Sequence, residues 1–444
     1  MSIAAFPLDK LLVILGNVLF ILFLGDQLFK RSPETSLKQH FWFAFSLKIF
    51  AGIALGLVYK FYYTSGDTFS LFRDSVRFSS VAFQNFGEYL NLLFSNGPIS
   101  IESSLENHNA RAVFMAKILS IPNLLTLQNY WLTTWYCSFF SFFGIWKCAN
   151  TLERLFKKHH LEIAMAFFYF PSVLFWTSGI LKESISIGSI CLLISLTLNF
   201  LHPGRKKAIY EKGLSIFIIL LCLLVIWKLK YYYFAVLSPC LLAYTLTICF
   251  ERFNTFNQIS NKLKFVILFS GIILAATLAH PNLNLEKFLN ALVKNNELMA
   301  EQTEKKENLI QFTQLNPNIQ SIVFNTPKAV IEGLFRPYIW EKGNLQKKLS
   351  SIESSFLLIL ILINTYYLAD KSIWNKKGEN NLLLLASIFY IGIMLIFLSL
   401  ASPNIGNLVR YQTGFKPFLV AILLSVSPIP QWATKLLKKE KWKI

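Results

Sequence analysis

The residues best suited to acid–base chemistry lie in one polar stretch, residues 62–78 (YYTSGDTFSLFRDSVRF). It holds Asp67 and Asp74, two of the five Asp residues in the chain, with Arg73 and Arg77 beside the second. A positioned carboxylate can act as a general base, which contributes on the order of 10²–10⁴-fold in rate. We predict Asp67 as the catalytic base and Asp74 as the second candidate. The alternative is that Asp67 only caps the helix that follows it.

Helical spacing gives this stretch one common face. If residues 68–80 form a helix, Leu71, Asp74 and Phe78 lie together on it with Arg77. Glu102 and His108 follow in the same loop. With Asp67 they could hold a divalent cation through oxygen and imidazole ligands. Their spacing is not that of a metal motif, so no cofactor is assigned.

A second set of candidates is cationic and lies at the ends of apolar stretches. Ionisable groups within the apolar part of a membrane are costly and usually face the protein interior or a ligand. Several cations together suit a phosphate or diphosphate, to which Arg offers two contacts and Lys a point charge. The alternatives are snorkelling to lipid headgroups and a local ion pair between the adjacent Lys182 and Glu183. The set comprises Lys182 with Glu183, Lys228, Lys230, Arg410 with its neighbour Tyr411, and Lys416.

A third candidate is the segment 333–344 (GLFRPYIWEKGN), in which charges alternate with aromatic rings. Arg336 and Glu341 flank Tyr338 and Trp340. Aromatic faces pack against sugar rings, but they also anchor proteins at membrane interfaces. We predict that these four residues bind substrate, with membrane anchoring as the alternative for Trp340.

The composition shows what must position these residues. Of 444 residues, 54% are hydrophobic and 15% charged, and the mean hydropathy is +0.47, which is typical of an integral membrane protein. The net charge of +19 is explained by short basic cytoplasmic loops and not by nucleic-acid binding. The six Cys residues lie in or beside apolar stretches, which predicts buried free thiols. Motifs of ATPases, dinucleotide enzymes and zinc proteases do not occur.

Apolar segments of about 20 residues predict an all-α polytopic protein, a single membrane domain over residues 1–444 with about 11 spans (range about 10–12). The predicted spans are 8–29, 41–62, 127–147, 161–178, 180–201, 213–228, 231–250, 263–280, 353–370, 381–400 and 408–428. Lys and Arg collect in alternate loops, which places the N-terminus outside and the C-terminus in the cytoplasm. The long loops 63–126 and 281–352 are then extracytoplasmic. Residues 111–125 are expected to form an interfacial or re-entrant helix ending near Pro122, and 285–312 an amphipathic helix.

Four short motifs occur together: GDT at 66–68, PSVLFWTSGILKES at 171–184, RPYIWE at 336–341 and NLVRYQTGFKPF at 407–418. With them the chain resembles bacterial polytopic GT-C-type glycosyltransferases and polysaccharide repeat-unit polymerases of the Wzy/EpsG-like kind. The resemblance implies inverting sugar transfer from a polyprenyl-phosphate or polyprenyl-diphosphate donor, with Asp67 as base. It implies Lys182, Arg336, Arg410 and Lys416 as cations that stabilise the leaving phosphate. The chain departs from the pattern in having Phe69 or Phe72 where a Tyr is usual and in lacking adjacent paired acids.

The expected function is therefore sugar transfer at the outer face of a bacterial inner membrane, with the bilayer and a polyprenyl-linked sugar as partners. Two alternatives stay open. One is a transporter or flippase for a lipid-linked or anionic solute, which favours charges near the bilayer midplane and an inverted repeat. The other is a non-catalytic scaffold subunit of an envelope machine. The sugar, the acceptor and the oligomeric state do not follow from the sequence.

Overall fold

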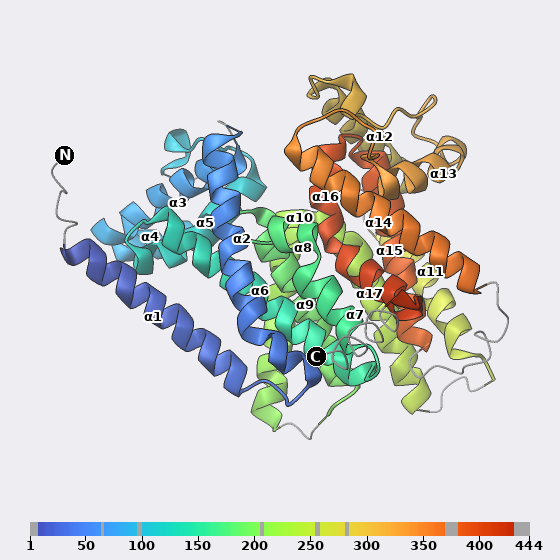
Figure 1. The fold of residues 1–444 in the computed structure, drawn as a ribbon, viewed down its shortest axis with the longest axis horizontal. Helices are drawn as coiled ribbons and strands as arrows, with labels where there is room; N and C mark the ends of the chain where they lie inside the picture. The colour runs from blue at the N-terminus through green and yellow to red at the C-terminus, as the bar shows by residue number, and fades with distance from the viewer. Residues whose placement is uncertain are drawn as a thin grey trace, which may run out of the picture. The chain divides into compact units, whose positions relative to one another are not determined.

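The computed structural model describes residues 8–63, 66–95, 100–204, 208–253, 258–279, 284–368 and 381–429. Within these ranges the regular elements are helical (Figure 1). One isolated antiparallel bridge joins Leu309 to Asn404. The all-α prediction is thus confirmed. The basic residues within 205–207, 371–377 and 435–443, which we used to orient the chain, lie outside the described residues.

The helices follow one another along the chain with these bounds. In order they are α1 (Leu8–Lys30), η1 (Ser36–His40), α2 (Phe41–Phe61), α3 (Asp67–Gln84), α4 (Phe86–Phe94), η2 (Glu102–Ser104), α5 (Ala110–Thr126), α6 (Tyr130–Leu155), α7 (His160–Ala164), η3 (Met165–Tyr169), α8 (Pro171–Trp176), α9 (Lys182–Leu201), α10 (Ile209–Arg252), α11 (Asn261–Ala279), α12 (Leu285–Glu301), η5 (Lys306–Asn308), α13 (Ile319–Phe335), α14 (Leu345–Leu368), α15 (Asn381–Ala401), α16 (Ile405–Tyr411), η6 (Gln412–Gly414) and α17 (Lys416–Val426).

The chain groups into two compact units. Unit 1 comprises Met1–Arg154, Leu174–Asn199 and Gly204–Tyr232. Unit 2 comprises Leu155–Val173, Phe200–Pro203 and Tyr233–Ile444. The single membrane domain expected over residues 1–444 stays a prediction.

Seven of the described helices are long and apolar enough to cross a membrane. They correspond to α1, α2 with the preceding η1, α9, α10, α11, α14 and α15, and an eighth span results if the bent pair α5–α6 is counted as one. The expected number of about 11 is not confirmed. Two expected spans are divided into short helices: 161–178 forms α7, η3 and α8, and 408–428 forms α16, η6 and α17.

Proline explains where these two spans divide. Phe170 precedes Pro171 and has extended backbone angles (φ −68°, ψ 118°), because a proline ring disfavours the helical region for the residue before it. In the second span Pro417 stands in the first turn of α17, where its missing N–H needs no helical partner. Pro171 therefore starts a new helix and Pro417 stands in the first turn of another, both inside apolar sequence.

Residues 213–250, which we expected as two spans, lie within α10, in which two helices meet at a kink. Lys230 inside it has non-helical angles (φ −144°, ψ 68°). The break falls between the two expected spans, 213–228 and 231–250, so the separation into two helices and its position agree with the prediction. The number of membrane crossings in this segment stays a prediction.

The helix expected over residues 111–125 is present as α5, and it continues through Pro122 to Thr126. Its interfacial or re-entrant placement stays a prediction. Leu127 and Gln128 then adopt left-handed backbone angles, and α6 leaves at a bend of 117°. The Asn129 side chain accepts hydrogen bonds from the amides of Trp131 and Leu132 at 3.0 and 3.2 Å. These bonds satisfy two donors at the start of α6.

In unit 1, α3 packs against α4 and α5, as the blue-to-cyan helices of Figure 1 illustrate. Leu71 and Phe78 are buried in apolar clusters with Met115 and Ala116 of α5. Elsewhere in this unit α6 and α9 approach very closely, since a Cβ added to Gly144 would lie 2.0 Å from the carbonyl oxygen of Gly188. Small residues allow such close helix contacts in membrane proteins.

In unit 2, α12 and α13 pack on α15. The predicted amphipathic helix 285–312 is confirmed in its first part as α12, whose Leu292 and Val293 are buried with Ala329 of α13 and Leu400 of α15. All six Cys residues of the chain are free thiols, as predicted, and all but the half-buried Cys249 are also buried as expected.

Candidate functional site

Asp74 is a buried anchor for the loop that precedes α5. Its side chain is fully buried in α3, on the helix face that also carries the buried Leu71 and Phe78. Oδ1 accepts hydrogen bonds from Arg77 Nη1 and the Glu106 amide, both at 2.7 Å. Oδ2 accepts from Asn107 Nδ2 at 2.7 Å and from the Asn107 amide at 3.1 Å. Four donors to one carboxylate make Asp74 a structural group rather than a base.

The arginines of this stretch are also held by the loop. Arg73 Nε and Nη2 donate to the two carboxylate oxygens of Glu106 at 2.5 and 2.7 Å, a bidentate pair. Arg77 Nη2 lies 3.8 Å from Glu106 Oε1. The hydrogen bond from Arg73, more than any other contact, lowers the pKa of Glu106. Glu106, which the sequence did not single out for this role, therefore closes the loop onto α3.

Asp67 has a different environment, because it is exposed in the first turn of α3. Gly66 occupies the N-cap position, one residue before Asp67, so Asp67 is not the N-cap residue that the alternative reading proposed. The backbone at Gly66 passes the Tyr59 ring so closely that an added Cβ would lie 2.5 Å from two ring carbons. The two residues after Asp67 fix the start of α3 to α6, since Thr68 Oγ1 is 2.8 Å from the Tyr130 hydroxyl and Phe69 stacks on the same ring. An exposed carboxylate on a fixed helix start remains suitable for base catalysis.

The proposed divalent-cation set of Asp67, Glu102 and His108 does not form a metal site. Throughout the described part of the chain, three or more His, Cys, Asp or Glu side chains nowhere come together in a geometry that could hold a metal ion.

The adjacent Lys182 and Glu183 begin α9. Glu183 is fully buried, and its carboxylate accepts from Lys230 Nζ at 2.7 Å. Lys230 is the residue at the break in α10, so the ion pair joins that break to the start of α9 within unit 1. The long-range partner of Glu183 was not foreseen, because 47 positions separate the two residues.

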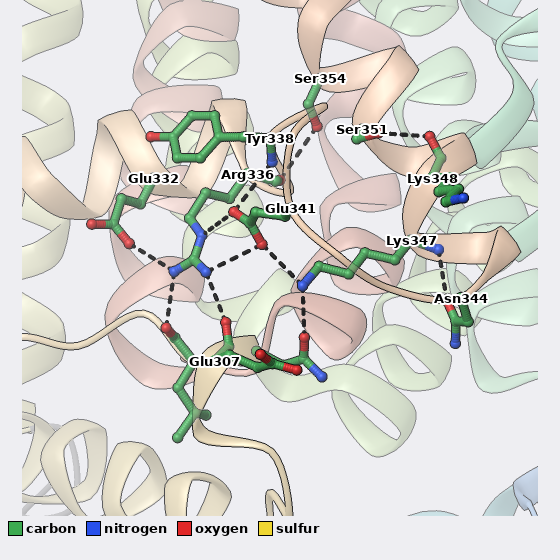
Figure 2. A network of polar contacts seen from close by, with 12 residues as sticks. Glu307, Glu332, Arg336, Tyr338, Glu341, Asn344, Lys347, Lys348, Ser351 and Ser354 are labelled. Carbon is green, nitrogen blue, oxygen red and sulfur yellow. Dashed lines mark hydrogen bonds and ion pairs between the residues drawn. The ribbon is translucent and has the colours of Figure 1, made fainter.

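In unit 2, Arg336 is enclosed by a network that uses its whole guanidinium group (Figure 2). Nε donates to Glu341 Oε1 at 2.8 Å, and Nη1 donates to the Leu309 carbonyl and Glu332 Oε2 at 2.9 and 3.1 Å. Nη2 donates to the Glu307 carbonyl and Glu341 Oε2 at 2.9 and 3.3 Å. A guanidinium has five N–H groups, and each has a protein acceptor here. Arg336 is therefore not available as the predicted phosphate ligand.

Glu341 is the second centre of this network. Besides Arg336, it contacts Lys347 Nζ, which lies 3.0 Å from Oε2, and the Tyr338 amide, which donates to Oε1 at 3.2 Å. Burial opposes ionisation of the carboxyl, but the hydrogen bonds from Arg336, Lys347 and the Tyr338 amide outweigh it and lower the pKa of Glu341. Lys347 also donates to Asn308 Oδ1 at 2.8 Å. The network thus ties segment 306–309 to the turn 336–341 and the first turn of α14.

This turn forms one wall of a pocket of about 450 Å³. The Tyr338 and Trp340 rings stack with centroids 4.9 Å apart and planes 9° from parallel. Trp340 is 75% exposed, so the pair presents a flat aromatic surface. The pocket is lined by Lys306, Glu307, Leu309, Gln311, Lys328, Glu332, Arg336, Tyr338, Trp340, Glu341, Lys342 and Lys347.

The last group of predicted cations lies in another part of unit 2. Arg410 in α16 is buried, and the carbonyl of Tyr411 accepts from the Tyr233 hydroxyl at 2.5 Å. Lys416 at the start of α17 is also buried, with Nζ 4.0 Å from Glu353 Oε2. Glu353 was missed in the sequence, although a carboxylate at the head of a predicted span was a usable signal. Its other oxygen accepts from the Ser172 amide at 2.6 Å.

The predicted site residues therefore divide between the two units. Asp67, Asp74, Lys182 and Glu183 belong to unit 1. The residues of unit 2 are Arg336, Tyr338, Trp340, Glu341, Arg410, Tyr411 and Lys416. Within unit 2, one pocket brings together Arg336, Tyr338, Trp340 and Glu341. A scan of protein-family models and searches of curated proteins and of solved structures find no match to this chain.

Proposed function

We propose that this chain is a membrane-embedded glycosyltransferase or polysaccharide polymerase that uses a polyprenyl-phosphate- or polyprenyl-diphosphate-linked sugar. The observation that carries the proposal is the pocket with the stacked Tyr338–Trp340 pair at the start of α14. α14 is one of the helices apolar enough to span a membrane. A saccharide attached to a membrane lipid is presented at that level, and aromatic faces pack well against sugar rings.

Asp67 is the base in this proposal. It is exposed and stands at the start of a helix that is fixed by contacts to α6. The Asp74 carboxylate, by contrast, is buried and accepts four hydrogen bonds. The bacterial inner membrane, the outer-face location and the topology with the N-terminus outside belong to the proposal and rest on the loop charges of the sequence. Lys182, Arg410 and Lys416 remain the candidate cations for the departing phosphate.

The first test identifies the lipid. The chain is purified from its native membrane in mild detergent, and bound lipids are extracted and analysed by mass spectrometry. We expect a polyprenyl lipid that carries one or more sugars, and its amount should fall in Trp340→Ala. Copurification of bulk phospholipid alone would contradict the proposal.

The second test separates an enzyme from a transporter or a scaffold. The protein is reconstituted in liposomes with the copurified glycolipid, and new glycosidic bonds are detected by mass spectrometry. We expect transfer by the natural chain and its loss in Asp67→Asn. Movement of the glycolipid between leaflets without bond formation would favour the transporter, and neither activity would favour the scaffold.

A further inference from the structure

The charges that line the pocket fall into an inner set and an outer set. The inner set is compensated, because the cations Arg336 and Lys347 face the carboxylates of Glu332 and Glu341. These four side chains are at most 20% exposed. The inner set therefore holds the pocket together and contributes little net charge to it.

The outer set is not compensated. It contains Lys306, Lys328 and Lys342 against the single carboxylate of Glu307. All four residues are exposed. Lys328 Nζ is 3.6 Å from Glu332 Oε1, while Lys306 and Lys342 form no ion pair with the residues that the structure describes. The pocket is thus lined by two exposed lysines that have no ion pair within the described part of the chain.

These ammonium groups line the same pocket as the aromatic surface. Trp340 precedes Glu341 and Lys342 in one turn, and its ring is largely exposed where it stacks on Tyr338. An aromatic face recognises the apolar face of a sugar ring, and ammonium groups recognise carboxylate or phosphate. The volume of about 450 Å³ falls within the usual range of small-molecule pockets, roughly 300–1,000 Å³.

From this combination we infer that the pocket selects an acidic saccharide, whose ring stacks on Trp340 and whose carboxylate or other anionic substituent contacts Lys306 and Lys342. The inference rests on the proposed function, because it specifies the chemical class of the sugar that the same pocket binds. An anionic lipid headgroup would satisfy the lysines but would leave the aromatic surface without a partner, so we favour the sugar.

The test compares acidic and neutral sugars on the full chain in nanodiscs of phosphatidylcholine. The probes are trigalacturonate, which has a carboxylate on each ring, and the neutral trisaccharide maltotriose. Binding is followed by isothermal titration calorimetry. We expect trigalacturonate to bind about tenfold more tightly than maltotriose, since each such charge contact contributes up to about 1 kcal/mol at an exposed site and about 1.4 kcal/mol is tenfold.

Two variants separate the charge from the aromatic surface. In Lys306→Gln/Lys342→Gln we expect the tenfold preference to disappear while maltotriose binding is retained. In Trp340→Ala both sugars should lose affinity. The matched control is Lys287→Gln/Lys294→Gln on the exposed face of α12, which should bind both sugars as the natural chain does.

Each other outcome overturns a defined part of the inference. If both sugars bind equally through Trp340, the charge selection is wrong and the proposed function survives. If neither sugar binds, the inference and the saccharide pocket both fail. If trigalacturonate does not bind but vesicles with phosphatidylglycerol bind in a manner that requires Lys306 and Lys342, the pocket is a lipid headgroup site and the inference is wrong.

Discussion

The substitution Asp74→Asn should release the loop that precedes α5 from α3. Two donors, Arg77 Nη1 and the Glu106 amide, point at Oδ1. Two more, from Asn107, point at Oδ2. An amide side chain presents one oxygen and one NH₂ group. In either orientation its NH₂ group faces two donors, so two of the four hydrogen bonds are lost.

The size of the effect follows from these lost bonds. A hydrogen bond to a charged group contributes about 1.5–3 kcal/mol, so losing two costs roughly 4 kcal/mol of local stability. Since about 1.4 kcal/mol is tenfold in an equilibrium constant, the open state of the loop should become about 10³-fold more populated. Asp67→Asn alters an exposed side chain, and its effect should stay within about 0.5 kcal/mol.

Hydrogen–deuterium exchange read by mass spectrometry measures this directly. The peptide of interest contains the Glu106 and Asn107 amides, which are protected in the natural chain by Asp74. We expect their exchange to accelerate by about 10³-fold in Asp74→Asn and by no more than about twofold in Asp67→Asn. Unchanged protection in Asp74→Asn would refute the anchoring role. Equal loss in Asp67→Asn would show that Asp67 also supports the fold, and its assignment as base would lose its basis.

Three further predictions concern the network, its pH dependence and the helix packing. Arg336→Lys keeps the charge but offers three N–H groups for five acceptor contacts, so segment 306–309 should lose its attachment and the local stability should fall by about 3 kcal/mol. Trypsin should then cleave after Lys306 faster than in the natural chain. The control Lys348→Arg should leave this cleavage rate unchanged. The pKa of Glu341 is lower in the folded chain than its usual 4.5, so the unfolded state binds the proton more tightly. The stabilisation that is present above about pH 4.5 is therefore lost as the pH falls through the folded value. The protection factor of the Tyr338 amide, which is its intrinsic exchange rate divided by the measured rate at the same pH, should fall below pH 4.5, and Glu341→Gln should remove that pH dependence. Gly144→Ala places a Cβ 2.0 Å from the Gly188 carbonyl oxygen and should lower the free energy of unfolding by about 2 kcal/mol, which is measured as a lower unfolding temperature in detergent. The control Gly213→Ala, where nothing lies within 4 Å of the added Cβ, should not lower the unfolding temperature.

The sequence predicted the elements whose signal is local. Helices α1, α2, α9, α11 and α15 begin and end within two residues of the spans expected from hydropathy. The spacing of Leu71, Asp74 and Phe78 likewise predicted that they share a helix face, because helical periodicity needs no partner. That this face is buried is a finding of the structure. Hydropathy averages over a window, so it did not resolve the start of α17 at Lys416, inside an apolar segment.

The roles of the charged residues could not be predicted in the same way, because a side chain's availability depends on distant groups. Arg336 looked like a phosphate ligand, yet its acceptors include the carbonyls of Glu307 and Leu309, which lie 29 and 27 positions away. Asp74 was the second candidate for the base, yet its carboxylate is held by donors of Glu106 and Asn107, which lie 32 and 33 positions away. In both cases the sequence identified the residue type and the structure decided how much of its bonding capacity is already used.

The same count of bonding capacity reverses the order of the candidates for anion binding at the pocket. The residue with the strongest motif, Arg336, has no N–H left to offer, while Lys306 and Lys342, which stand in ordinary polar sequence, have ammonium groups without an ion pair in the described chain. A saturated arginine still contributes to recognition, because it fixes the turn that carries Tyr338, Trp340 and Lys342. Loss of Arg336 should therefore weaken binding of acidic and neutral sugars alike, whereas loss of the two lysines should affect the acidic sugar alone. That difference separates the group that builds the pocket from the groups that select its ligand.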